Sequence, residues 1–325
     1  MGQTGTLRSL SVVVPNYNHS KYLERCLTAI VRQSFSPLEI IVLDDASTDN
    51  SVQVIKRFAA EHSLVRLVQN EKNLGVMSNL NKGAGLSRGE YIFIASADDE
   101  VLPGIFEKSM NLLAQHPRAG ISSTISIWRY VDSGLSWHMA AGMSDKPAYL
   151  SPDEVAHLAK KSKLLISSNT VVFRKAALED VGLFKPDLRW HADWFAMTTC
   201  AFRYGLCFIP EVLGIINILP KSFFTAGRRT QEHRQVLTNI LDNLNSPAYS
   251  DVRPLIRDSG ALSLFAPEML TLIGSNKKYR PYLSGPFLRG SVKRTAELAG
   301  KKILPKWLAR CILNVLYRAP ATNPA

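Results

Sequence analysis

Short runs of β-branched and other apolar residues alternate with amphipathic stretches over the first hundred residues, and this alternation constrains the fold more than any other feature. The apolar runs are typical of buried strands, which we predict at 10–15, 38–43, 65–68 and 91–94. Apolar residues at helical spacing between these runs predict helices at 18–34, 49–62 and 77–86. Strands joined through helices form right-handed βαβ units. The chain is therefore predicted to be an α/β protein with a mostly parallel sheet flanked by helices.

The second part of the chain shows similar elements less regularly. We predict helices at 103–115, 152–161 and 191–204, and strands at 119–130 and 168–173. The stretch 131–151 is weakly patterned, so we predict a loop there that faces a substrate. From about residue 231 onward the chain is predicted to be mostly helical, including 307–317.

Positive charge is concentrated toward the carboxyl-terminal end of the chain. Residues 1–220 hold 22 Lys and Arg against 21 Asp and Glu, whereas residues 221–325 hold 17 against 6. Such an uneven distribution favours a polyanionic partner, either nucleic acid or an anionic membrane surface. Aromatic residues in the basic region are few and match no RNA- or DNA-binding module, so nucleic acid is the less favoured partner.

Nothing in the sequence indicates secretion or membrane insertion. The first predicted strand starts near residue 10, which leaves no room for a signal peptide. No apolar stretch reaches the length of about 18 residues that a membrane span needs. The four cysteines, Cys26, Cys200, Cys207 and Cys311, are scattered without metal-ligand or disulfide spacing. We therefore expect a cytoplasmic protein with reduced thiols.

Polar side chains follow three of the first four predicted strands. The sequences at these strand ends are PNYN at 15–18, DDASTD at 44–49 and SADDE at 96–100. In an open parallel sheet, ligands bind outside the carboxyl ends of the strands. The glycine-rich patterns of dinucleotide sites and P-loops are absent. Carboxylates at these places can instead hold a divalent cation that bridges to phosphate, or accept hydrogen bonds from a base or ribose. Ser47 or Asp49 can also serve simply as a helix cap.

Four motifs in order carry a resemblance to a known family. They are VVVPNYN, IIVLDDASTDNS, EKNLGV and GEYIFIASADDE, all in the strand contexts described above. Together they resemble the family 2 glycosyltransferases, which have the GT-A fold, and the resemblance covers roughly residues 9–215. It implies a GT-A catalytic domain over 1–220, with a nucleotide-binding half at 9–100 and an acceptor half at 101–220. The mostly helical, basic region at 221–325 would then be an extension of that domain.

The resemblance also implies which residues bind the donor. Those placed around the nucleotide are Pro15, Asn16, Tyr17, Asp44, Asn73 and Asp98. Asp44 would bond the base, and Lys72 is an alternative to Asn73 in the base pocket. Asp98 would contact the ribose or phosphate side, and Asp99 would be the principal ligand of Mg²⁺ or Mn²⁺, with Asp98 beside it.

The acceptor half contains the segment LRWHADWFAM at 188–197, which resembles the acidic helix of the family. Ala192 stands where many members have Glu, so Asp193 is the single candidate for the general base, and the less favoured alternative is that it caps the helix. The neighbouring aromatic residues, Trp190, His191 and Trp194, either contact the acceptor or belong to the core. Two further residues, Arg228 and Arg229, are candidates for binding the departing diphosphate.

The function implied is an inverting, divalent-metal-dependent glycosyltransferase. It would move a sugar from a nucleotide-sugar donor to a hydroxyl of a glycan or lipid-linked acceptor, in the synthesis of envelope or surface polysaccharide. The alternatives from the residues alone are a sugar nucleotidyltransferase, which also uses an α/β nucleotide fold, and a non-catalytic basic nucleic-acid-binding protein. The first usually needs a glycine-rich basic loop after the first strand, and this chain has none there.

The basic region suggests where the protein works. Five apolar residues share one face of the predicted helix at 307–317, namely Leu308, Cys311, Ile312, Val315 and Leu316. A basic amphipathic helix of this kind can lie in the headgroup layer of an anionic bilayer. That would place a cytoplasmic enzyme peripherally on the inner face of the plasma membrane. The alternative is that the same apolar face packs on the catalytic domain.

Overall fold

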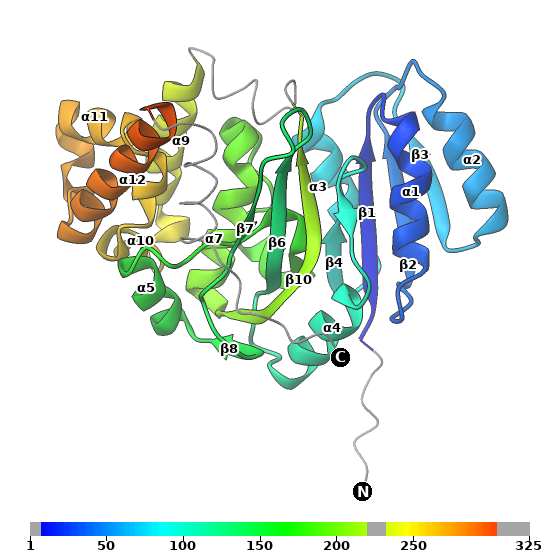
Figure 1. The fold of residues 1–325 in the computed structure, drawn as a ribbon, viewed down its shortest axis with the longest axis horizontal. Helices are drawn as coiled ribbons and strands as arrows, with labels where there is room; N and C mark the ends of the chain where they lie inside the picture. The colour runs from blue at the N-terminus through cyan, green and yellow to red at the C-terminus, as the bar shows by residue number, and fades with distance from the viewer. Residues whose placement is uncertain (1–7, 220–231, 304–325) are drawn as a thin grey trace, which may run out of the picture.

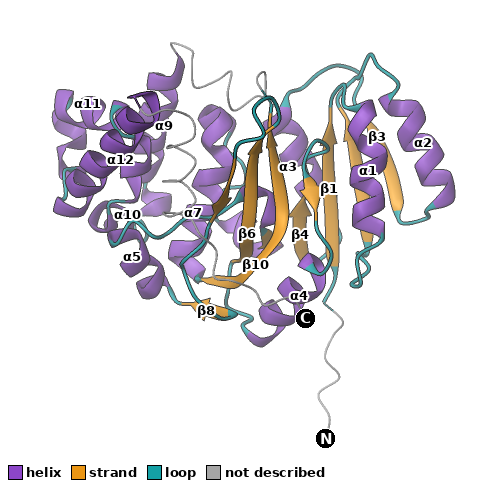
Figure 2. Cartoon of the chain, in the orientation of Figure 1, coloured by secondary structure: helices purple, strands orange, loops and turns teal. Residues whose placement is uncertain are grey.

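The computed structural model describes residues 8–219 and 232–303, and within these ranges ten strands form one sheet (Figures 1 and 2). They are β1 (Leu10–Asn16), β2 (Glu39–Asp44), β3 (Val65–Gln69), β4 (Tyr91–Ile94), β5 (Glu100–Val101), β6 (Ile121–Tyr130), β7 (Ser136–Met139), β8 (Ala148–Leu150), β9 (Val172–Arg174) and β10 (Leu206–Ile218). Their order is β3-β2-β1-β4-β9-β6-β10-β5, with β7 beside β6 and β8 beside β10. The predicted α/β fold is confirmed.

Helices cover the sheet, and a further group of helices lies beyond one end of it. The α-helices are α1 (Ser20–Val31), α2 (Ser51–Glu61), α3 (Val76–Leu86), α4 (Ile105–Gln115), α5 (Pro152–Lys160), α6 (Lys175–Asp180), α7 (Ala192–Tyr204), α9 (Glu232–Asn245), α10 (Arg253–Ser259), α11 (Glu268–Ser275) and α12 (Gly285–Ile303). The 3₁₀ helices are η1 (Ser168–Thr170), η2 (Pro186–His191), η3 (Pro247–Tyr249), η4 (Ala261–Phe265) and η5 (Lys277–Tyr282). No α-helix within the described ranges is long and apolar enough to cross a membrane.

The first four strands follow from their sequences because both faces of each strand are covered. Val12 and Val14 lie in the core beneath α1 and α2, whereas Val13 lies in the core beneath α3. Alternate side chains of a strand point to opposite faces, so a strand buried on both sides must be apolar throughout. Helix α3 lies so close to the sheet that a Cβ at Gly83 would come within 2.3 Å of a Val13 methyl group.

Two predictions about the second part of the chain were wrong. The stretch 131–151 is not only a loop, because it contains β7 and β8, which pair with β6 and β10. The predicted strand at 168–173 begins instead as η1, and only β9 at its end pairs in the sheet. In both cases hydrogen bonds to distant strands decide the conformation, and a local pattern does not report them.

Strand β10 runs through the Pro-Glu pair at 210–211 and continues to Ile218. Its pairing with β6 shifts register between Ile209 and Val212, because Pro210 has no N–H to donate to the ladder. A second shift lies between Val212 and Gly214, and from Gly214 the strand pairs residue by residue with β6 up to Ile218, opposite Tyr130.

The carboxyl ends of the long strands meet at one edge of the sheet. Strands β1, β2, β3 and β4 are parallel, and the antiparallel β9 between β4 and β6 makes β6 parallel to β4 again. Strand β10 is parallel to β6. The ends of β1, β2, β4, β6 and β10 therefore lie along the same edge, which is at the top of Figure 1.

Helices α9 to α12 form a group at the far end of the sheet, beyond α7 (Figure 1). Their apolar residues, such as Leu237 and Leu241 of α9, belong to the same buried cluster as Phe195 and Met197 of α7. The described part of the basic region thus shares a core with α7. The segment 307–317 lies outside the described residues.

Candidate active site

The ends of β1 and β2 are joined through side chains. Asn16 and Asp44 are aligned in register, and the Asn16 amide donates a hydrogen bond of 2.8 Å to Asp44 Oδ1. The other oxygen of Asp44 accepts from the backbone N–H of Ser47 at 3.1 Å. Both side chains are buried, with Asp44 only 1% exposed. The side-chain oxygen of Asn16, Oδ1, is buried without a hydrogen-bond partner among the described residues, so a ligand at this edge can donate to it.

The other residues expected around the nucleotide lie more openly. Tyr17 is 46% exposed just after β1, and Pro15 is half-buried. Asn73 and Lys72 are exposed in the loop before α3, where the Asn73 side chain accepts from the Gly75 N–H. The structure therefore brings Asn16 and Asp44 into direct contact and leaves Tyr17, Lys72 and Asn73 at the rim.

Asp45 organises this edge, and our sequence reasoning did not select it. Its carboxylate accepts hydrogen bonds from Leu74 N–H, Gly75 N–H and the Asn70 amide, all at 2.8–2.9 Å. Burial alone would raise the pKa of Asp45, but these hydrogen bonds outweigh it and lower the pKa. The sequence did contain a signal for Asp45, because it is the second of two acids that follow a buried strand.

Asp49 holds the loop after β2 to the start of α1. It accepts hydrogen bonds from the backbone N–H groups of Ser20 and Ser51, at 3.0 and 2.9 Å. Burial tends to raise the pKa of Asp49, but these partners lower it to about 2. Asn18, with a positive φ of 56°, accepts from Thr48 N–H in the same loop. Asp49 therefore bonds the first N–H of both α1 and α2, but the N-cap residue of α2 is Asn50, so the predicted N-cap role of Asp49 was wrong.

The acids after β4 have a different environment. Asp99 is only 8% exposed and accepts a hydrogen bond of 2.9 Å from Asn217 N–H. Its burial and the neighbouring charge of Asp98 raise the pKa of Asp99 well above its usual range. Asp98 is partly exposed, and its backbone carbonyl accepts from the Asn217 amide at 2.7 Å. Asn217, near the end of β10, thus holds both acids.

Two arginines surround the third acid of this loop. Glu100 forms an ion pair with Arg129 and lies 3.7 Å from the Arg25 guanidinium. Arg129 also donates two hydrogen bonds to the side-chain oxygen of Asn217, Oδ1, at 3.0 and 2.7 Å. Glu100 is therefore neutralised by protein groups, whereas Asp98 and Asp99 have no ion pair with Lys or Arg among the described residues and remain the candidate ligand-binding acids of this loop. No group of three or more His, Cys, Asp or Glu side chains suited to a metal ion occurs in residues 8–219 and 232–303.

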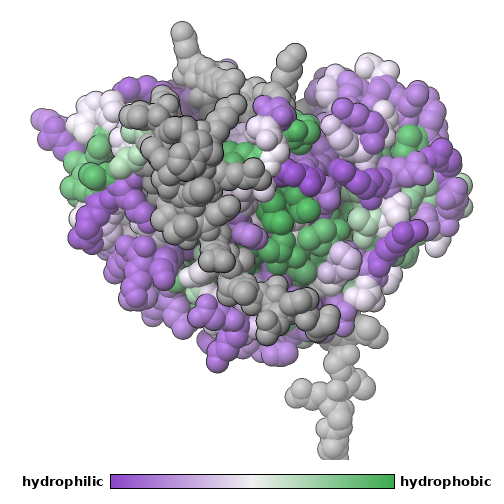
Figure 3. All heavy atoms as spheres, in the orientation of Figure 1, coloured by the Kyte–Doolittle hydropathy of each residue, from purple (hydrophilic) through white to green (hydrophobic). Residues whose placement is uncertain are grey.

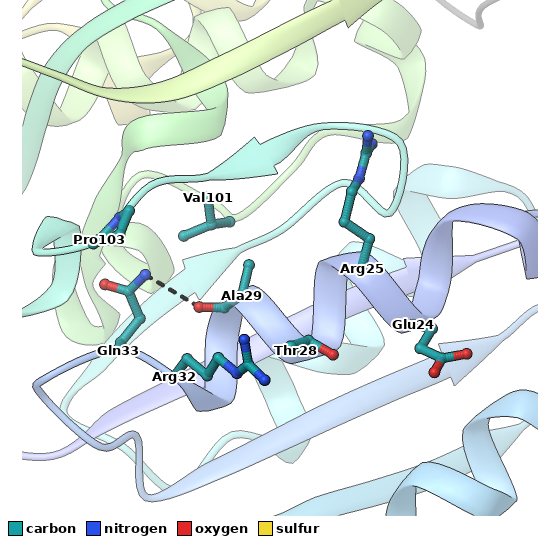
Figure 4. A pocket seen from close by; sticks show the side chains of 8 residues that line it. All are labelled: Glu24, Arg25, Thr28, Ala29, Arg32, Gln33, Val101 and Pro103. Carbon is teal, nitrogen blue, oxygen red and sulfur yellow. Dashed lines mark hydrogen bonds between the residues drawn. The ribbon is translucent and has the colours of Figure 1, made fainter.

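A groove with a volume of ≈ 540 Å³ lies beside this loop, on the outer face of α1 (Figure 4). Its lining residues are Glu24, Arg25, Thr28, Ala29, Arg32, Gln33, Val101 and Pro103. Exposed apolar side chains gather in the middle of the face of the molecule drawn in Figure 3. The groove lies to one side of the edge where the strands end, and Arg25 connects the two through its hydrogen bond to the Asp98 carbonyl.

Asp193 lies in the first turn of α7. Burial raises the pKa of its carboxyl, although hydrogen bonds from the Trp194 N–H and the Ser168 hydroxyl partly oppose this. Ser168 is next in sequence to Ser167, whose hydroxyl contacts Ser126 and Trp128 in the carboxyl-terminal half of β6. The candidate base therefore lies on the same half of the sheet as Asp98 and Asp99.

The aromatic residues beside Asp193 pack against the carboxyl-terminal helices. Trp190 stacks on His233 of α9 with ring centroids 6.1 Å apart. His191 and Trp194 meet Phe265 of η4 edge-on, at 4.7 and 4.6 Å. Trp190 and His191 are buried, so their placement favours the packing role over contact with an acceptor. The candidates Arg228 and Arg229 lie outside the described residues.

Comparison with solved structures places this geometry among glycosyltransferases. The protein TarS of S. aureus, in complex with UDP-GlcNAc, superposes with a TM-score of 0.59 over 82% of this chain and 80% of that chain, at 17% identity. The mannosyltransferase PcManGT of Pyrobaculum calidifontis, in complex with GDP-Man and Mn²⁺, gives 0.56 over 95% of this chain and 86% of that chain, at 20% identity. These likenesses show the GT-A fold.

Sequence relatives point the same way. The chain is 33% identical to the uncharacterized glycosyltransferase YibD of Escherichia coli, over 39% of this chain and 37% of the relative. It is 40% identical to glycosyltransferase GlyG of Streptococcus pneumoniae, over 30% of this chain and 33% of the relative. These matches span about a third of each relative's length. The family model for glycosyl transferase family 2 matches residues 11–182, more than half of the chain. The chain therefore belongs to glycosyl transferase family 2.

Proposed function

We propose that this enzyme is an inverting, divalent-metal-dependent glycosyltransferase that moves a sugar from a nucleoside-diphosphate sugar to a hydroxyl group. The observation that carries the proposal is the pairing of two kinds of carboxylate at one edge of the sheet. Asp98 and Asp99 are held by Asn217 at the end of β10, and Asp193 lies in the first turn of α7, where its carboxylate accepts a hydrogen bond from the Trp194 N–H. Asp98 and Asp99 are suited to bind a metal ion together with a diphosphate, and Asp193 is suited to take the proton of the acceptor hydroxyl.

The residues present fit Mg²⁺ or Mn²⁺. These ions are commonly bound through one or two carboxylates together with substrate phosphates. Asp99 is buried beside the like charge of Asp98, which is unfavourable unless a cation or a proton compensates it. Asp99 would be the principal ligand, with Asp98 beside it toward the ribose and phosphates. When bound, the ion supplies Lewis-acid stabilisation of the leaving diphosphate.

The nucleotide would lie across the ends of β1 and β2. Asp44 would accept a hydrogen bond from the base, while Asn16, whose amide bonds Asp44, offers its buried side-chain oxygen Oδ1. Pro15, Tyr17 and Asn73 would line the rim of this pocket. Because Asp45 fixes the backbone of Leu74 and Gly75, the loop that carries Asn73 is already ordered before a nucleotide binds.

Asp193 would act as the general base. Its carboxylate takes the proton of the acceptor hydroxyl as the hydroxyl oxygen forms a bond to the anomeric carbon. The bond from that carbon to the donor phosphate oxygen breaks, and the electron pair leaves with the nucleoside diphosphate. A single displacement of this kind inverts the anomeric centre. The raised pKa of Asp193 suits this role because it increases the proton affinity of the carboxylate.

The donors and metal seen in structural neighbours support this proposal. TarS is bound to UDP-GlcNAc in one structure, and PcManGT to GDP-Man and Mn²⁺ in another. A glycan or lipid-linked acceptor in the synthesis of envelope or surface polysaccharide would fit the basic carboxyl-terminal region. The sugar and the base of the donor are open to direct measurement.

A donor panel tests the proposed function. The full chain is incubated with UDP- and GDP-linked hexoses, with and without Mn²⁺, and both nucleoside diphosphate and pyrophosphate are measured. We expect release of nucleoside diphosphate that EDTA abolishes. Pyrophosphate release would instead identify a sugar nucleotidyltransferase. Full activity in EDTA would contradict the metal assignment, and no turnover of any donor together with binding to nucleic acid would favour the non-catalytic alternative.

We also propose that the carboxyl-terminal region binds an anionic membrane surface. Helix α12 exposes Leu288 and Val292 together with Arg289 and Lys293 on one side. Apolar side chains flanked by basic ones are typical of helices that lie in the headgroup layer. The full-length protein should float with anionic vesicles, less so in high salt, and Arg289→Glu with Lys293→Glu should weaken flotation. Equal, negligible flotation with anionic and neutral vesicles would contradict the proposal.

A further inference from the structure

Three aromatic side chains gather on the hairpin formed by β6 and β7. Trp128 and Trp137 are directly opposite each other in the two strands, with ring centroids 6.0 Å apart and planes at 44°. Tyr130 lies 5.5 Å from Trp137, with an angle of 47° between the rings. Tyr130 is 38% exposed, and both indoles are partly exposed. We call these three residues the hairpin aromatics.

The hairpin aromatics lie on the face of the β6–β7 hairpin that is nearer to Asp193. Trp128 donates through its indole N–H to Ser167 Oγ at 3.3 Å. The next residue, Ser168, begins η1, which packs against α7, and it is one of the groups that lower the pKa of Asp193. Ser167 and Ser168 therefore lie between the first ring and the candidate base.

The opposite face of the same strand leads to the candidate metal ligands. Successive side chains of a strand point to opposite faces, so Arg129 points away from Trp128 and Tyr130. Arg129 bonds Asn217 and Glu100, and Asn217 holds Asp98 and Asp99. The end of β6 thus connects the three rings to both halves of the site. Figure 1 shows the hairpin at the edge where the parallel strands end.

We propose that the hairpin aromatics form an acceptor subsite that binds a hexopyranose ring. The axial C–H groups of a pyranose make an apolar face, which fits an aromatic ring, while its hydroxyl groups remain at the rim. One hydroxyl of a sugar held there would lie toward Asp193, and the donor would lie toward Asp98 and Asp99. This inference rests on the proposed function and deepens it: it assigns the acceptor as a sugar that presents an apolar face.

A nucleotide-independent binding experiment tests the subsite. Methyl α- and β-glycosides of glucose, galactose and mannose are titrated into the full-length protein and followed by saturation-transfer NMR. Two matched pairs separate the ring from the rest of the side chain: Tyr130→Phe against Tyr130→Leu, and Trp137→Phe against Trp137→Leu. Val131→Ala, at the tip of the same hairpin and 54% exposed, is the control for loss of an exposed apolar group.

We expect at least one glycoside to bind the wild type. Each Leu variant should weaken binding by about 2- to 12-fold, the range for losing one aromatic contact, while the Phe variants and Val131→Ala stay near the wild type. Affinity for UDP or GDP and the melting temperature should be unchanged. Absence of glycoside binding to the wild type, or equal binding by the Leu and Phe variants, would overturn the inference. An equal loss of nucleotide affinity in the Leu variants would overturn it too.

The outcome is separate from that of the proposed function. If the donor panel releases nucleoside diphosphate but the ring variants bind glycosides normally, the enzyme is a glycosyltransferase whose acceptor lies elsewhere. If no donor is turned over, the proposed function fails whatever the hairpin binds.

Discussion

The acids after β2 and the acids after β4 lie at the same edge of the sheet, but their surroundings differ. Asp45 and Asp49 accept hydrogen bonds from neighbouring backbone N–H groups, and these partners lower the pKa of both. Asp99 has one backbone donor, a like charge beside it and a raised pKa. Asp193 shares the raised pKa, which burial causes.

This difference separates acids that hold the fold from acids that await a ligand. A carboxylate whose oxygens are occupied by backbone donors stabilises a loop and has little left to offer a substrate. A buried carboxylate with few donors destabilises the protein until a cation or a proton reaches it, and such groups cluster at functional sites. We therefore expect substitutions at the two places to affect different measurements.

The largest effect should come from Asp193→Asn. The amide has nearly the same shape but cannot take a proton, and loss of a general base typically lowers the rate by about 10²–10⁴-fold. Nucleotide affinity and melting temperature should stay near the wild type, since the proposed nucleotide pocket lies at the ends of β1 and β2, away from Asp193. Loss of nucleotide binding with unchanged turnover per bound donor would show that Asp193 has another role.

The pH dependence of the wild type sharpens this prediction. Because the pKa of Asp193 is raised, the carboxyl keeps its proton to higher pH than an exposed Asp does. Turnover should therefore rise as the pH increases through that raised pKa and fall below it. Measuring kcat against pH for the wild type checks this, and an acid limb at the ordinary value for Asp would contradict it.

An intermediate effect is expected from Asn217→Ala. Asn217 holds Asp98 and binds Arg129 through its side chain, while its backbone N–H still reaches Asp99 in the variant. Loss of such a supporting group typically costs 10–100-fold in metal affinity or activity. Titration of activity with Mn²⁺ should show a higher half-saturating concentration. Unchanged metal dependence would mean that Asn217 only stabilises the end of β10.

Asp45→Ala should mainly affect stability. The substitution leaves buried N–H groups of the 74–75 loop without an acceptor, which costs about 1–3 kcal/mol in the free energy of unfolding. Chemical denaturation measures this loss, and the wild type is the reference. Normal stability together with abolished turnover would show that Asp45 takes part in catalysis, which would contradict its assignment as an acid that stabilises the fold.

The smallest effect is expected from Asp49→Ala, which removes a helix-start acceptor and costs about 1 kcal/mol. The pKa of Asp49 is about 2 in the folded state, below the ordinary 3.8, so its stabilising effect is present above pH 3.8 and is lost toward pH 2. The difference in unfolding free energy between wild type and variant should thus shrink on acidification. A difference that is constant from pH 7 to pH 2.5 would contradict this.

An element could be predicted from the sequence where its conformation depends on its own residues, and could not where it depends on contacts with distant parts of the chain. Strands β1 to β4 are apolar on both faces, so their own sequences report their burial. Strands β7 and β8 depend on hydrogen bonds to β6 and β10, which no local pattern contains. Candidate acids could be selected because they follow predicted strands directly, as Asp44 and Asp99 do.

The supporting residues of the site could not be selected in this way. Asn217 is 118 residues from Asp99 in the sequence and reaches it only because β10 lies in the sheet beside β5 and β6. Arg129 likewise meets Glu100 from the end of a different strand. The packing of Trp190 and His191 against His233 and Phe265 depends on where the carboxyl-terminal helices lie.

Binding of Mn²⁺ in the presence of UDP or GDP tests the central claim most directly. Electron paramagnetic resonance counts free Mn²⁺ while each nucleotide is titrated into the wild type, Asp99→Asn and the control Asp49→Asn. We predict that the wild type and Asp49→Asn bind Mn²⁺ together with a nucleotide, whereas Asp99→Asn does not, although it remains folded. Equal Mn²⁺ binding by Asp99→Asn and the wild type would contradict the account, because the acids after β4 would then differ from those after β2 in environment but not in role.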